Sequence, residues 1–138
     1  DGTGVFLLEL VDTAFATIAY VGLYRSGANY QLRLTRYRPA TVSTNYNFAA
    51  ATGTWYCVET KFFEDAATGE YHVWLDGTER ITDVGLNTSG ADFDKIRVGR
   101  TAQGYSPFNV YVDCVVVADA YIGPEAEANP LVTHVRIH

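Results

Sequence analysis

The feature that most constrains the fold is a pair of short segments that meet at Asp76-Gly77. Before this dipeptide, Val73 and Leu75 alternate with more polar neighbours, as the two faces of a β-strand do. Asp-Gly readily adopts the positive φ angles that a two-residue type I′ turn requires, so the chain is expected to reverse direction here. The sequence therefore predicts an antiparallel β-hairpin whose returning strand covers residues 78–82.

Further strands are predicted wherever apolar and polar residues alternate, or β-branched residues cluster, between turn signals. Their ranges are 5–11, 15–24, 30–37, 41–48, 54–63, 70–75, 94–99, 108–117 and 131–138. No segment has a helical period that is stronger than these strand patterns. Short strands separated by frequent turns predict an all-β fold, an antiparallel sandwich or a barrel, of which we expect the sandwich.

Size and charge exclude several classes of protein. The chain has 138 residues, enough for one domain with its own core, and 48% of them are hydrophobic, which excludes a disordered chain. A formal net charge of −6 argues against binding to nucleic acid or to an anionic membrane surface. No apolar run approaches the length of about 18 residues that a transmembrane helix needs. The chain opens Asp1-Gly2-Thr3-Gly4 without Met or an apolar leader, which we interpret as a processed or excised start.

The two cysteines, Cys57 and Cys114, lie in separate predicted strands. Their spacing matches no zinc motif, which would need four clustered ligands. If the two strands are neighbours, a disulfide is geometrically possible, and closing so long a loop would stabilise the fold by about 2–4 kcal/mol. Two buried free thiols are the alternative.

Four motifs in a fixed order carry a resemblance to a known family. They are Trp55-Tyr56-Cys57-Val58-Glu59, the run from Gly69 to Gly77, Ile96-Arg97-Val98-Gly99, and Val110–Val117 followed by Tyr121-Ile122-Gly123-Pro124. Together they resemble the second half of the concanavalin A-like jelly rolls, particularly the laminin-G-like modules of secreted proteins. The resemblance implies an antiparallel two-sheet jelly-roll sandwich over residues 1–124. Residues 125–138 would then be a C-terminal extension, a linker plus a strand that could pair with a neighbouring subunit.

The same resemblance frames the expected function. Members of this family that hydrolyse glycans resemble glucanases, which carry their catalytic carboxylates in a Glu-x-Asp-x-x-Glu strand. This chain has no such triplet. It also has no Gly-x-Ser-x-Gly motif and no plausible catalytic Cys/His pair. We therefore expect no enzyme. The resemblance implies a non-catalytic glycan-binding or adhesion module that is extracellular or at the cell surface. The alternative is a structural subunit of an extracellular filament, fibre or surface assembly that exchanges strands between subunits.

Aromatic residues supply the main candidate site. By alternation Trp74 shares a face with His72, and its flat ring could stack on the apolar face of a sugar. The polar residues His72, Arg33 and Glu59 are candidates for hydrogen bonds to that sugar, and Tyr105 and Tyr37 are further aromatic candidates. The alternative is that Trp74 packs against the facing sheet or a neighbouring subunit.

Calcium is the one cofactor that we consider for this chain. Many laminin-G-like modules bind it through loop carboxylates and carbonyl oxygens, which are the hard ligands that this ion prefers. The loop residues that could serve here are Asp83, Asn87, Asp92, Asp94 and Asp119. They do not form a recognised calcium-loop spacing, so solvated carboxylates are the alternative.

Overall fold

The computed structural model describes residues 4–27, 29–90, 93–101, 110–113, 115–118 and 134–137. Within them the chain forms ten strands and no helix, which confirms the prediction of an all-β fold. The strands are β1 (Gly4–Asp12), β2 (Thr17–Ser26), β3 (Asn29–Arg36), β4 (Val42–Phe48), β5 (Trp55–Phe63), β6 (Gly69–Leu75), β7 (Thr78–Leu86), β8 (Phe93–Thr101), β9 (Val110–Asp113) and β10 (His134–Ile137).

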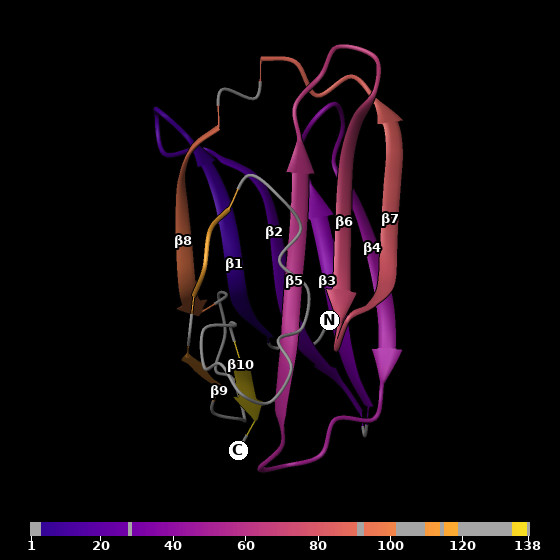
Figure 1. Ribbon diagram of the computed structural model, residues 1–138, viewed down its shortest axis with the longest axis vertical. Helices are drawn as coiled ribbons and strands as arrows, with labels where there is room; N and C mark the ends of the chain where they lie inside the picture. Colours follow the sequence, from indigo (N-terminus) through magenta and orange to yellow (C-terminus); the bar gives the residue numbers. More distant parts are fainter. Residues whose placement is uncertain are drawn as a thin grey trace.

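The strands form two five-stranded sheets that face each other (Figure 1). Sheet A has the order β4-β3-β2-β1-β8, and sheet B has the order β7-β6-β5-β10-β9. Every pairing between neighbouring strands is antiparallel. The predicted antiparallel β-sandwich is therefore confirmed.

The core lies between the inner faces of the two sheets, and strand alternation decides which residues enter it. In β6, Tyr71, Val73 and Leu75 are buried and belong to the core, whereas the residues between them are only partly buried. Leu32 and Leu34 of β3 contribute from sheet A in the same way. Each such side chain adds about 1.5–3 kcal/mol when it leaves water, so the alternation fixes which face of each strand points outward.

The predicted Asp-Gly turn is confirmed. Asp76 and Gly77 have φ angles of 50° and 71°, the positive values that a type I′ turn needs at both central positions. The Asp76 carboxylate also accepts a hydrogen bond from the Cys57 backbone N–H at 2.8 Å, and the Asp76 N–H donates to the Cys57 carbonyl at 2.9 Å. These two bonds tie the turn to β5.

Strand β7 is longer than the sequence predicts. Its pairing with β6 shifts once after Glu79, because Trp74 lies opposite Glu79 but Val73 lies opposite Ile81, and Arg80 is left over. The shift turns Ile81 inward, where it is buried in the core. A second shift occurs near Gly85, and these bulges let pairing continue to Leu86. The predicted returning strand, residues 78–82, is therefore too short.

The C-terminal strand β10 lies within sheet B, between β5 and β9. It pairs with Trp55–Cys57 of β5 on one side and with all of β9 on the other. A neighbouring subunit could receive this strand only if it left its place here. Residues 115–118, which were part of a longer predicted strand, form none.

Candidate functional site

The candidate glycan-binding residues lie on opposite outer faces of the sandwich and do not form one site. His72, Trp74 and Glu59 belong to the outer face of sheet B, because their strand neighbours point into the core. Arg33 belongs to β3 of sheet A, and Tyr37 directly follows that strand and contacts Tyr20 of β2. Tyr105 lies outside the described residues.

His72 and Trp74 form a stacked pair on the outer face of β6. Their ring centroids are 5.4 Å apart and their planes differ by 15°. The two residues are separated by one position in the strand, so their side chains emerge on the same side of the sheet. Trp74 therefore does not pack against sheet A.

Charged side chains hold His72 on both sides of its ring. Nδ1 of His72 is hydrogen-bonded to Glu79 of β7, and Nε2 lies 3.2 Å from Oε2 of Glu70, its neighbour on β6. Lys61 of β5 donates to the same Glu70 oxygen at 2.6 Å. The hydrogen bond from Lys61 lowers the pKa of Glu70, and the one to His72 lowers the pKa of Glu79. His72 thus joins β6 to β7, and Glu70 joins β6 to β5 through Lys61.

Glu59 completes this surface, because it lies directly opposite Trp74 in the pairing of β5 with β6. We call the group the Trp74 face: Glu59, Lys61, Glu70, His72, Trp74 and Glu79. It combines an aromatic pair with three carboxylates and one ammonium group. Glu59 Oε2 is buried, so the accessible acceptors are mainly the carboxylates of Glu70 and Glu79. Carboxylates accept hydrogen bonds from hydroxyl groups, so this surface can hold a polyhydroxylated ligand but repels an anionic one.

Lys61, Glu70 and Glu79 were not predicted from the sequence as site residues. For Glu70 the strand alternation could have indicated the site, because Glu70 lies two positions before His72 and so shares its face. A similar signal exists for Glu79, because a two-residue turn places it opposite Trp74. Lys61 becomes a neighbour of His72 only through the register of β5 with β6, which no local pattern reveals.

Arg33 is held in a layered cluster on the outer face of sheet A. Its guanidinium lies 4.0 Å from the ring centroid of Tyr24, and its Nε donates to Oδ1 of Asn45 at 2.8 Å. The Tyr24 ring lies so close to Gly4 and Gly22 that a Cβ at either position would collide with it. The main polar group of Arg33 is therefore already used within the fold.

Tyr37 belongs to a second cluster on the same face. The residue is 41% exposed, and its ring centroid is 6.3 Å from that of Tyr20. Burial raises the pKa of Tyr37, and the charges of Tyr20 and Glu9 add to the effect. Glu9 is only 1% exposed and accepts a hydrogen bond from Thr17 at 2.6 Å. The buried carboxylate is satisfied within the protein, which leaves the Tyr37 ring as the accessible feature.

The calcium candidates are dispersed and engaged elsewhere. Asp83 lies in β7 and forms an ion pair with Arg36, and Asp94 of β8 pairs with Lys95. Asn87 accepts a hydrogen bond from the Ser89 hydroxyl at 2.6 Å. Asp92 and Asp119 lie outside the described residues. The structure brings none of the first three together.

Cys57 is buried, and burial raises the pKa of its thiol to about 11, with smaller contributions from Glu59 and Asp76. The condition for the predicted disulfide was that β5 and the strand of Cys114 are neighbours. In sheet B, β10 lies between β5 and β9, so these two strands are not neighbours. Their separation is two strand spacings, about 10 Å, which is longer than a disulfide can span. Cys57 is a free thiol in the structure, so for Cys57 the alternative of a buried free cysteine holds and the disulfide is not formed. Cys114 itself lies outside the described residues.

The described part of the chain contains no group of three or more His, Cys, Asp or Glu side chains placed to hold a metal ion. In that part there is also no helix with the length and apolarity to cross a bilayer. Comparisons of the chain with protein-family models, with curated proteins and with solved structures found no match.

Proposed function

We propose that this chain is a non-catalytic glycan-binding or adhesion module, extracellular or at the cell surface, and that it binds its ligand at the Trp74 face. The observation that carries the proposal is the stacked pair of His72 and Trp74, which is surrounded by hydrogen-bonding groups from three strands. The resemblance of residues 55–124 to laminin-G-like modules supports the same function.

The chemistry of the face favours uncharged glycans. A sugar ring has an apolar C–H side that packs against an aromatic ring, and hydroxyl groups at its rim that donate to carboxylates. Three carboxylates and one lysine leave an excess of negative charge at the face, apart from any charge on His72. Sulfated and uronic-acid glycans are therefore disfavoured by repulsion.

The non-catalytic part of the proposal is supported by the ionisation of the carboxylates that contact His72. A glycosidase needs one carboxylic acid that keeps its proton near neutral pH, which requires a raised pKa. Hydrogen bonds from Lys61 and His72 instead lower the pKa of Glu70 and Glu79. Both are thus ionised acceptors and not proton donors.

A glycan array tests the proposal, with neutral, sulfated and uronic-acid oligosaccharides on one surface. We expect the wild-type chain to bind neutral glycans and Trp74→Ala to bind them at least tenfold more weakly, a loss of about 1.4 kcal/mol. Tyr37→Ala is the matched control, because it removes an accessible ring from the opposite face. Thermal unfolding checks that both variants fold. An array without any bound glycan, or equal losses in the two variants, would contradict the proposal.

A further inference from the structure

Among the described residues, the two sheets end in four edge strands: β4 and β8 in sheet A, and β7 and β9 in sheet B. An edge strand presents unpaired backbone groups that can pair with another chain. Proteins usually block such edges with charges, bulges, proline or a very short strand. The four edges of this sandwich differ in whether they carry such a block.

Three of the four edges are blocked. Strand β7 has two register shifts and carries Glu79 and Arg80. Strand β8 carries charges at Asp94, Lys95 and Arg97, and Gly99 has a φ of 70°. Strand β9 has only four residues. Each of these features discourages a regular pairing with a further strand.

Strand β4 has none of them. It is seven residues long, from Val42 to Phe48, with no charged residue and no proline. Its pairing with β3 runs through all seven positions without a register shift. Five of its side chains are exposed and only Tyr46 and Phe48 are partly buried. In the described part of the chain β4 pairs with β3 alone. It is therefore a regularly paired edge with no charged residue of its own and with five exposed side chains.

We propose that β4 pairs antiparallel with β4 of a second copy of this chain, about a two-fold axis at Asn45, the middle residue of the strand. Because β4 is antiparallel to β3, its even-numbered residues lie opposite Leu32 and Leu34 and share their inner face. In the proposed register Val42 faces Phe48 of the second copy and Thr44 faces Tyr46. Ser43 faces Asn47 on the outer side. Apolar residues of β4 then meet apolar or neutral ones across the junction. Arg80 of β7, whose guanidinium lies 4.8 Å from the Tyr46 ring centroid, lies beside the inner face of β4 in each copy.

Self-complementarity about Asn45 favours a second copy over an unrelated peptide. When the two-fold axis passes through a pair of directly opposite residues, side chains of the inner face in one copy lie opposite side chains of the inner face in the other. The alternation of the two faces therefore continues across the junction. The axis is perpendicular to sheet A, so sheet B of both copies lies on the same side. Two Trp74 faces would then point in one direction, and this arrangement requires no exchange of the C-terminal strand.

Analytical ultracentrifugation over a range of protein concentrations tests this pairing. We expect a monomer–dimer equilibrium for the wild type, and at least tenfold weaker association for Asn45→Glu, which places two glutamates opposite each other. Within each copy the new carboxylate lies opposite Arg33, the residue of β3 that pairs with position 45, so the fold itself should tolerate it. Gln31→Glu is the matched control, because it adds the same charge on the same outer face but on β3, which is already paired on both sides and lies away from the proposed junction. The dimer of this variant should persist.

A charge exchange makes the register itself testable. Mixing Ser43→Glu with Asn47→Lys should give tighter association than either variant alone, because residue 43 faces residue 47 of the second copy and opposite charges then meet. Within each copy these two positions lie opposite the uncharged Thr35 and Gln31. Backbone hydrogen exchange of wild-type β4 gives a measurement without any variant, and its amides should become protected as concentration rises. A wild type that stays monomeric up to about 1 mM would overturn the proposal. So would an Asn45→Glu variant that associates as tightly as the wild type.

Discussion

Arg36 of β3 and Asp83 of β7 form an ion pair across the sandwich, so one side-chain contact joins the two sheets. The Arg36 side chain is 9% exposed and that of Asp83 is 24% exposed. Arg36 also donates to the carbonyl of Ala40 at 2.9 Å, in the connection to β4. This arginine therefore holds β7 and the start of β4 at the same end of the core.

Asp83→Ala should destabilise the fold by about 3 kcal/mol, because it leaves the buried charge of Arg36 without its carboxylate. The free energy of unfolding in urea measures the effect. Thr82→Ala, an exposed change on the same strand, is the control and should stay within about 0.5 kcal/mol of wild type. A similarly small effect of Asp83→Ala would show that the ion pair does not contribute to stability.

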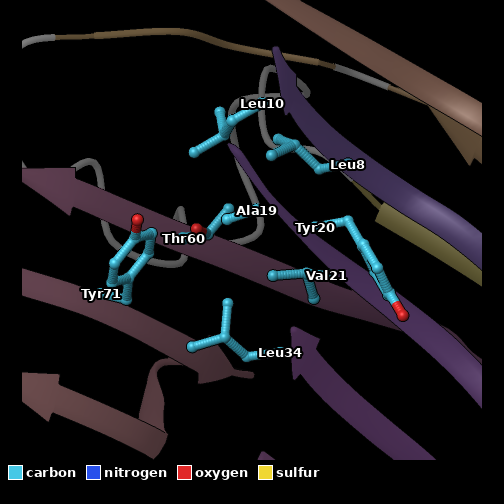
Figure 2. Close-up of a pocket in the computed structure, with 8 residues that line it drawn as sticks. All are labelled: Leu8, Leu10, Ala19, Tyr20, Val21, Leu34, Thr60 and Tyr71. Carbon is cyan, nitrogen blue, oxygen red and sulfur yellow. The ribbon is translucent and has the colours of Figure 1, made fainter. Parts of the chain in front are cut away.

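Tyr71→Phe should stabilise the protein by about 1 kcal/mol. The Tyr71 hydroxyl is buried and has no hydrogen-bond partner among the described residues. Figure 2 shows Tyr71 beside Thr60, across the core from Leu10 and Leu34, in a space that cannot hold a water molecule. Removing an unsatisfied hydroxyl at constant shape avoids its desolvation penalty. A lower midpoint of urea unfolding in the variant would mean that the hydroxyl has a stabilising partner.

Stability should fall at alkaline pH. Burial raises the pKa of Tyr71 from its ordinary 10.0 to about 12 and that of Cys57 from 9.0 to about 11. Between pH 9 and 12 the unfolded chain therefore loses protons that the folded chain keeps, and the free energy of unfolding declines. Urea unfolding at intervals from pH 8 to 11 measures the slope. Tyr71→Phe should decline less steeply above pH 10, and an unchanged slope would contradict this assignment.

Gly69→Ala should destabilise the protein by about 2 kcal/mol, because overpacking a buried site forces its neighbours apart. A Cβ at Gly69 would collide with the Thr88 side chain, which is completely buried. The Thr88 hydroxyl accepts a hydrogen bond from the Asp65 N–H at 2.9 Å, and the Thr88 N–H donates to the Asp65 carbonyl at 2.8 Å. Thermal unfolding gives the result. Gly27→Ala has open space around the new Cβ but a φ of 62°, so its cost reports left-handed backbone strain without any collision and gives a separate reference for the Gly69 effect.

Strand positions could be predicted from local patterns, whereas several strand lengths and pairings could not. The Asp76-Gly77 turn is confirmed because its geometry depends on two adjacent residues. The bulge at Arg80 depends on Ile81 reaching the core opposite Val73, which is a property of packing across the sheet. The insertion of β10 between β5 and β9 joins residues far apart in the sequence, which alternation alone does not indicate.

The candidate site was predictable only within one strand. Alternation places His72 and Trp74 on one face, and the structure stacks them. Arg33 and Tyr37 carry similar chemistry, but the division of strands between two sheets puts them on the opposite side of the sandwich. Which strands share a sheet is decided by long-range pairing, so residue type alone cannot assemble a site from different strands.

The most direct test of glycan binding at the Trp74 face is a ¹⁵N chemical-shift titration with a neutral glycan retained on the array. The chain has two tryptophans, so the indole N–H signal of Trp74 can be assigned by substituting Trp55. We expect the Trp74 indole and the backbone amides around His72 to shift until saturation, while those of Arg33 and Tyr37 stay unchanged. Shifts confined to the Arg33 and Tyr37 side, or no shift at any glycan concentration, would contradict the account.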